Sequence, residues 1–348
     1  MPFNKNKNPL AKKREISDTN LLTIITISIF ILMYVFAVIF LGSGFKKPQT
    51  FCNMLNANAS LIIISCGLSL VMITGGIDIS VGCMTCLVCM SCAVHLDESM
   101  KNGSLFGAIM IALMIGVLFG LVQGYLVAYL DIQPFIVTLA GMFFAKGMTT
   151  IVNASQFNVK NAVFDALRYT KILLPGIGST NKKGVFIQAY VEPGVIVAII
   201  VVVFMFCFLR WTKLGRSFYA VGGNKQSANM LGIDVKRTKF LSHFICSILA
   251  AIGAFVYFMH VGSGSPTHAS GYEMNAIASS IIGGTMLTGG VGNILGTFFG
   301  VLSLATIKDI VASIGLDDPW WINITVSLMI CLFLVIQSVV LSRKNKDK

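Results

Sequence analysis

Residues 52–82 read CNMLNANASLIIISCGLSLVMITGGIDISVG, and this stretch decides the fold. A helix needs about 20 residues to cross about 30 Å of hydrocarbon. The apolar run here has that length and ends at the adjacent glycines Gly75 and Gly76. A lone carboxylate, Asp78, precedes the next apolar run. A charge in hydrocarbon costs several kcal/mol, so Asp78 must lie either at a hydrated boundary or in a polar site.

The composition of the whole chain indicates a multi-pass membrane protein. Of its 348 residues, 55% are hydrophobic and only 11% are charged, and the mean hydropathy is +0.82. The apolar runs are too long, and alternate too little, for barrel strands. We therefore expect an all-α fold with about ten membrane-spanning helices. Their predicted ranges are 21–42, 52–74, 79–95, 105–129, 134–152, 191–209, 239–261, 274–288, 294–314 and 319–341.

The distribution of Lys and Arg predicts the orientation of these helices. With the N-terminus in the cytoplasm, sixteen of these residues fall on the inner side and eight on the outer side, as the positive-inside rule requires. Both termini are then cytoplasmic, in basic tails at 1–20 and 342–348 that flank a transmembrane domain at 21–341. The net charge of +12 is assigned to contact with membrane lipid, not with nucleic acid.

Two predicted loops are long enough to have functions of their own. Residues 153–190 lie on the predicted outer side and include the basic pair Lys182 and Lys183, and residues 210–238 lie on the inner side. A membrane chain with a platform on each face and no soluble domain is suited to docking partner proteins. The alternative, that the outer loop is only a connector, stays open.

The inner loop contains the signals of a short helix. Gly222 and Gly223 are expected to form a turn, and Asn224 to cap the helix that follows. That helix spans residues 225–231, and Gly232 ends it. Such a helix, surrounded by Lys and Arg, fits a groove in a cytoplasmic partner. On pattern alone it could also lie on the membrane surface with its lysines among the lipid headgroups.

No pattern for catalysis, cofactor binding or metal binding is found, so the chain is not expected to be an enzyme. A phosphate-binding loop requires a Gly-Lys dipeptide, which the sequence lacks. The four histidines are scattered, without metal-ligand spacing. Four cysteines recur at intervals of three, which in one helix turns successive thiols away from a common cluster, so we expect them to serve helix packing. They are Cys83, Cys86, Cys89 and Cys92.

Four blocks of sequence carry a family resemblance: residues 75–82, 134–142, 219–233 and 276–292. Together, and in this order, they resemble the permease subunits of bacterial ATP-binding-cassette (ABC) sugar importers of the ribose and galactose class. The likeness extends across residues 20–341, and within the class it is greatest to galactofuranose permeases. The sequence departs from the common form at Cys83, where serine is usual.

The resemblance implies a translocation subunit in the bacterial inner membrane that imports a monosaccharide by alternating access. It also implies three partners: a cytoplasmic ATPase, a second permease, identical or homologous, and an extracytoplasmic sugar-binding protein. ATP hydrolysis then takes place on another polypeptide. The residues that match the family's ATPase-coupling region are Gly222, Gly223, Asn224, Ala228, Gly232 and Ile233.

The few charges within the predicted spans leave an alternative function open. An ion-coupled secondary transporter would use Asp78 or Asp309 as its proton site. Lys308 and Asp309 are consecutive in one helix, so they point in different directions and are not each other's partner. Lys146 is near the outer end of its helix and is expected to extend its amine to the interface.

The glycine turn is predicted at the cytoplasmic ends of two helices, where Asp78 is expected to be hydrated and to cap the following helix. The stretch is interpreted as a glycine-hinged junction that gates the inner end of the pathway, not as a sugar-binding site. Residues 288–291 resemble residues 74–77. Equivalent turns of an internal repeat would explain this, although chance similarity is the explanation we favour. The predicted gate residues are Gly75, Gly76, Asp78, Ser80, Gly82, Gly289 and Gly290.

Overall fold

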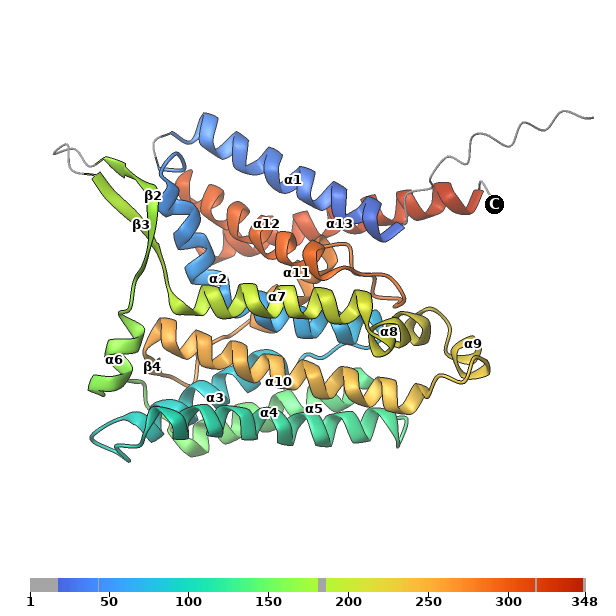
Figure 1. Ribbon diagram of the computed structural model, residues 1–348, viewed down its shortest axis with the longest axis horizontal. Coiled ribbons are helices and arrows are strands. Elements are labelled where there is room, and N and C mark those ends of the chain that lie inside the picture. Colours follow the sequence, from blue (N-terminus) through green and yellow to red (C-terminus); the bar gives the residue numbers. More distant parts are fainter. Residues whose placement is uncertain (1–17, 43, 181–185, 317, 347–348) are drawn as a thin grey trace, which may run out of the picture.

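The computed structural model describes residues 18–42, 44–180, 186–316 and 318–346 (Figure 1). The predicted tail up to residue 17 and the pair Lys182 and Lys183 lie outside the described residues. The described elements are α1 (Asp18–Phe40), α2 (Pro48–Ile73), α3 (Val81–Leu96), α4 (Leu105–Ala128), α5 (Pro134–Val152), β1 (Phe157–Asn158), α6 (Ala162–Arg168), β2 (Ile172–Thr180), β3 (Phe186–Val191), α7 (Pro193–Trp211), α8 (Lys213–Gly223), α9 (Lys225–Met230), α10 (Val235–Val261), β4 (Ser263–Gly264), α11 (Tyr272–Ile282), α12 (Ile294–Ser313) and α13 (Pro319–Lys346).

Each predicted span corresponds to a helix, but not every helix is long enough to cross a membrane. Within the described residues, seven helices have the length and hydropathy of a span, and two further apolar helices, Val81–Leu96 and Trp320–Ile336, are shorter. The predicted span at 274–288 is wrong, because α11 has 11 residues, or about 16 Å, half the hydrocarbon thickness. Residues 283–293 continue as non-helical backbone to α12. At the C-terminus α13 continues to Lys346, so the predicted tail at 342–348 begins inside a helix.

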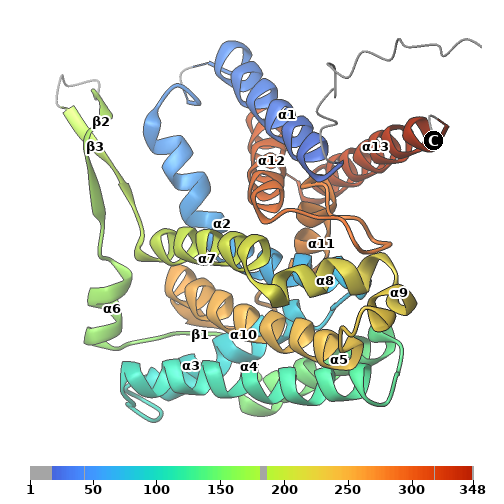
Figure 2. The same cartoon turned by 45° about the vertical axis from the view of Figure 1, so that its right-hand side comes forward.

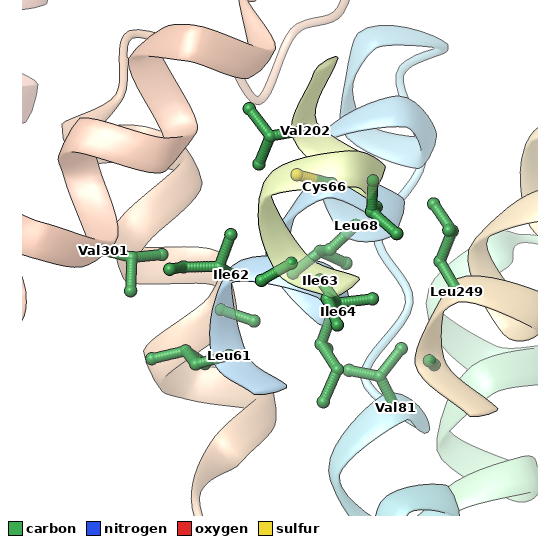
Figure 3. Packing of buried hydrophobic residues seen from close by; sticks show 14 of the residues in the cluster. Leu61, Ile62, Ile63, Ile64, Cys66, Leu68, Val81, Val202, Leu249 and Val301 are labelled. Carbon is green, nitrogen blue, oxygen red and sulfur yellow. The ribbon is translucent and has the colours of Figure 1, made fainter. Parts of the chain in front are cut away.

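Helix α2 forms the centre of the bundle. Residues 59–73 are all buried, whereas fewer than half of the residues of α4 and of α5 are buried. Helices α7, α10, α11 and α12 pack around α2. Figure 3 shows Val202, Leu249 and Val301, from three of these helices, gathered around the run from Leu61 to Ile64. Since lipid tails are as apolar as these side chains, close packing is what holds such a core together within a membrane.

Helix α4 packs along α10 through glycines spaced four residues apart (Figure 2). A methyl group on Gly120 would lie 3.0 Å from the Cα atom of Phe244, and one on Gly124 would lie 3.1 Å from the carbonyl oxygen of Phe240. Gly116 is equally close to Ala251. Small residues at this spacing let two helix backbones approach each other closely.

We expect Gly120→Leu to destabilise the protein by about 1–3 kcal/mol, because the new side chain overpacks the contact between α4 and α10. Thermal unfolding in detergent measures the effect. Val122→Leu is the matched control, since Val122 is 57% exposed on the same helix. Equal melting temperatures for the two variants would contradict the packing described here.

The two ends of the bundle differ (Figure 1). One end bears α6 and the antiparallel pair β2 and β3, in which Ile172 lies opposite Val191. The short pair β1 and β4 joins the same loop to the segment after α10. The other end bears α8 and α9, and α1 begins and α13 ends there. The predicted loop at 153–190 thus contains short strands and a helix, and the predicted helical membrane fold is confirmed.

Candidate functional site

The segment predicted as the inner loop contains a helix, α8, that the sequence patterns did not indicate. It begins after Thr212, whose hydroxyl accepts a hydrogen bond from the Gly215 N–H at 2.9 Å. Phe218 and Val221 are buried on one side of it. Gly222 is part of this helix and Gly223 is its last residue, so the turn predicted at these two glycines is wrong. The helical backbone continues through both glycines and ends at Asn224, whose φ of −157° and ψ of 111° are extended.

Gly222 lies directly on the backbone at the end of α2. A methyl group at this position would collide with the carbonyl oxygen of Ile73 and lie 2.6 Å from the Gly290 nitrogen. These two atoms are hydrogen bonded to each other, since the Gly290 N–H donates to Ile73 O at 2.8 Å. Helix α8, the end of α2 and segment 283–293 therefore meet backbone to backbone.

Gly289 and Gly290 complete this contact. Their φ angles are 86° and 76°, a conformation that glycine adopts readily and other residues rarely do. A methyl group on Gly289 would lie 3.0 Å from the Cα atom of Gly75, and one on Gly290 would lie 2.8 Å from that of Gly223. We call the contact of Gly75, Gly222, Gly289 and Gly290 the glycine junction. It brings together the two turns whose sequences resemble each other.

Tyr219 attaches α8 to the same segment. Its hydroxyl donates a hydrogen bond to the carbonyl oxygen of Gly292 at 3.0 Å. Burial raises the pKa of Tyr219 to about 12, so the phenol stays protonated and keeps its donor at neutral pH. Helix α8 is therefore joined to segment 283–293 by a hydrogen bond as well as by close packing.

The short helix predicted after Asn224 is confirmed. The Asn224 side chain accepts a hydrogen bond from the Ser227 N–H at 2.9 Å and so caps α9. Gly232 has a φ of 78° and ends the helix, with the Ile233 N–H donating to Ala228 O at 3.1 Å, as in a Schellman motif. The predicted end at residue 231 is one residue beyond the observed end at Met230.

Helix α9 presents an apolar tip to the surroundings. Met230 and Leu231 are 87% and 79% exposed, while Ala228 is buried against the rest of the protein. Exposed Lys225 and Gln226 stand on the same helix. An apolar tip with polar neighbours is typical of a surface that docks another protein.

The expectation that Asp78 is hydrated is wrong. Residues 76–80 form non-helical backbone between α2 and α3, and the Asp78 side chain is fully buried there. Its Oδ1 atom accepts hydrogen bonds from the Ser80 N–H at 2.9 Å and from the Ser80 hydroxyl at 2.6 Å. Gln123 of α4 donates to the same hydroxyl at 3.0 Å. Asp78 thus binds Ser80, the N-cap residue of α3, from within the protein. Its carboxylate accepts from the N–H and hydroxyl of Ser80 and not from the first amides of α3, so the predicted cap is wrong.

His243 of α10 borders the same segment. A methyl group on Gly76 would lie 3.5 Å from its Cε1 atom, and its Nδ1 atom lies 3.1 Å from the carbonyl oxygen of Lys239. Two buried atoms here, His243 Nε2 and Asp78 Oδ2, have no hydrogen-bond partner among the described residues. A cavity of about 250 Å³ lies beside them, lined in part by Gly75, Pro134 and His243.

The predicted site residues therefore fall in separate places. Gly75, Gly289 and Gly290 meet Gly222, one of the predicted coupling residues, at the glycine junction, whereas Asp78 and Ser80 lie in the interior. Gly82 is on the first turn of α3, against the carboxylate of Glu273 from α11. The sequence analysis missed Glu273 and Gln123, since no local motif marks them, and it placed Tyr219 in a resembling block without its contact to Gly292, which is distant in the chain.

Comparisons with known proteins identify the family. The family model "Branched-chain amino acid transport system / permease component" matches residues 50–336. The chain is 33% identical to the inner membrane ABC transporter permease protein YjfF of Escherichia coli K12, over 91% of this chain and 92% of that protein. It is 34% identical to the fructose import permease protein FruG of Bifidobacterium longum, over 92% and 91% of the two chains.

A third relative is the ribose import permease protein RbsC of Bacillus subtilis, 30% identical over 92% of each chain. No solved structure matches the chain. None of these three relatives is named for galactofuranose. Since the matches extend over nearly the whole bundle, including the glycine junction, the chain belongs to the ABC importer permease family and is a multi-pass membrane transporter subunit, not an enzyme.

Proposed function

We propose that the chain is the permease through which an ABC importer moves a monosaccharide into a bacterial cell. Relatives named for fructose and ribose import, matched along nine tenths of the chain, support a sugar as the substrate. Galactofuranose, to which the sequence resemblance points, is one candidate among such sugars. Selection among them falls to a separate binding protein.

The two ends of the bundle provide docking surfaces for the partners. Helices α8 and α9, with exposed Met230 and Leu231, would receive the cytoplasmic ATPase. The opposite end would receive the sugar-binding protein, since the strand pair there exposes the apolar residues Ile177, Phe186 and Ile187. With α8 and α9 on the cytoplasmic side, both termini are cytoplasmic as well. A second permease would complete the translocation unit in the inner membrane.

The observation that carries the mechanism is the glycine junction. Gly222 leaves no side chain between α8 and the backbone of Ile73 and Gly290, so a displacement of α8 is transmitted to both at once. Closure of the ATPase pair would push α8, and the end of α2 and segment 283–293 would move with it. Rigid-body movement of this kind switches the open side of the pathway in alternating access.

Sugar uptake by cells tests the proposal. We expect deletion of this chain to abolish saturable uptake of one monosaccharide, because no other route across the membrane is supplied by the ATPase or the binding protein. Inactivating the partner ATPase should cause the same loss. Uptake that continues unchanged with an inactive ATPase would contradict the proposed function.

A further inference from the structure

Three side chains away from the glycine junction gather on one side of the bundle. Cys83 on the first turn of α3 and Glu273 on α11 are half-buried, and Lys146 on α5 is exposed. Helix α3 packs against both α5 and α11. The Glu273 carboxylate lies against Gly82, the residue before Cys83, and Lys146 is carried by α5. We call Cys83, Lys146 and Glu273 the polar patch.

The polar patch lies at membrane depth. At a rise of 1.5 Å per residue, Cys83 is about 20 Å along α3 from its end at Leu96. Lys146 is about 18 Å along α5 from its start at Pro134. Both positions fall within a hydrocarbon core of about 30 Å. Glu273 is held at the level of Cys83, because its carboxylate rests on Gly82.

A charged side chain at this depth raises the free energy of the protein in the membrane unless a polar group or water contacts it. A Lys or Asp facing the centre of the bilayer costs about 2.5–3.5 kcal/mol or more. The Lys146 amine forms no hydrogen bond or short ion pair within the described part of the chain, although the Lys146 carbonyl oxygen accepts from the Thr150 hydroxyl. The sequence analysis expects the Lys146 amine to extend to the membrane interface. The Glu273 carboxylate does not extend in this way, since it lies against the first turn of α3.

The chemistry of the polar patch suits a neutral, hydroxylated solute. One positive and one negative group nearly cancel, so the patch has no strong preference for an ion of either sign. Glu273 offers acceptors and Lys146 offers donors, which are the partners that hydroxyl groups need. Helices α3 and α11 both begin within the bundle after non-helical segments, and helix ends at membrane depth commonly border transport pathways.

We propose that Cys83, Lys146 and Glu273 contact the hydroxyl groups of the sugar as it crosses the membrane. This inference rests on the proposed function and adds the residues that line the pathway. Lys146 is exposed in the single chain, and the second permease of the proposed complex would cover it.

The native cysteines make the proposal testable. Of the nine cysteines, only Cys83, Cys207 and Cys331 are not buried. Replacing Cys207 and Cys331 with serine leaves Cys83 as the accessible thiol. A small charged methanethiosulfonate reagent is then applied to vesicles that contain the whole complex. We expect the reagent to lower sugar uptake at least tenfold during turnover, and excess sugar with its binding protein to slow the labelling. With Cys83→Ser added, uptake should resist the reagent.

A second measurement guards against a merely structural effect. We expect Lys146→Met and Glu273→Gln to lower uptake at least tenfold, with ATP hydrolysis retained, while Thr150→Ala, an exposed position on the same helix, leaves uptake unchanged. Complete labelling of Cys83 without loss of uptake, or normal uptake by both charge variants, would overturn this inference alone. If the unmodified complex moves no sugar, the proposed function itself fails.

Discussion

Gly222→Ala is expected to abolish coupled sugar uptake while ATP hydrolysis by the assembled complex continues. The added methyl group collides with a backbone carbonyl, that of Ile73, which cannot rotate away as a side chain could. Helix α8 must shift, or the hydrogen bond from Gly290 to Ile73 must break. A hydrogen bond contributes about 1 kcal/mol, and losing it alters an equilibrium between two conformations about fivefold. Uptake and phosphate release, measured on the same vesicles, give the number of sugars moved per ATP.

Gly223→Ala is the matched control for this experiment. The position is next in the same helix, and a methyl group there would meet nothing within 4 Å. Both substitutions raise helix propensity by about 1 kcal/mol, so propensity cannot explain a difference between them. We expect Gly223→Ala to transport sugar as the unmodified protein does. Equal uptake by the two variants would mean that the glycine junction does not transmit movement.

Asp78→Ala is expected to destabilise the protein by about 2–4 kcal/mol. The substitution removes the acceptor of two hydrogen bonds and leaves the buried Ser80 N–H without that acceptor, while the Ser80 hydroxyl keeps its contact with Gln123. Each unsatisfied buried group costs about 1–3 kcal/mol. Thermal unfolding in detergent measures the loss, and Glu98→Ala is the control because that acidic side chain is exposed.

Asp78→Asn separates a structural role from proton transfer. The amide oxygen still accepts from Ser80, but the side chain no longer binds a proton reversibly. We expect this variant to recover most of the stability lost in Asp78→Ala and to retain sugar uptake. A stable Asp78→Asn protein that moves no sugar would instead favour the ion-coupled mechanism with Asp78 as its proton site.

Long apolar runs were readable from the sequence because the bilayer imposes one length on every spanning helix. The exception is α11, which ends at Ile282, where the backbone of Gly283 packs closely against that of Gly296 of α12. The Asn224 cap and the Gly232 terminus were also predictable, since both act within a few residues.

Contacts between distant segments were not readable in this way. Gly222 and Gly223 look alike in the sequence, and only the approach of Ile73 and Gly290 makes one of them intolerant of a methyl group. Asp78 was wrongly predicted to be hydrated, because the count of Lys and Arg on each side of the membrane locates the glycine turn but does not show where the chain runs after it. The spaced glycines of α4 carry a packing signal that the sequence analysis did not use.

Uptake of the labelled sugar into sealed vesicles tests the account's central claim most directly. The vesicles contain this chain with its partner permease and ATPase, and the binding protein is supplied on the side where the strand pair lies. The account predicts that uptake requires ATP on the side of the membrane where α8 and α9 lie. It also predicts that uptake continues when ionophores collapse every ion gradient. Uptake that stops with the ion gradients while ATP remains, or that proceeds without ATP hydrolysis, would contradict it.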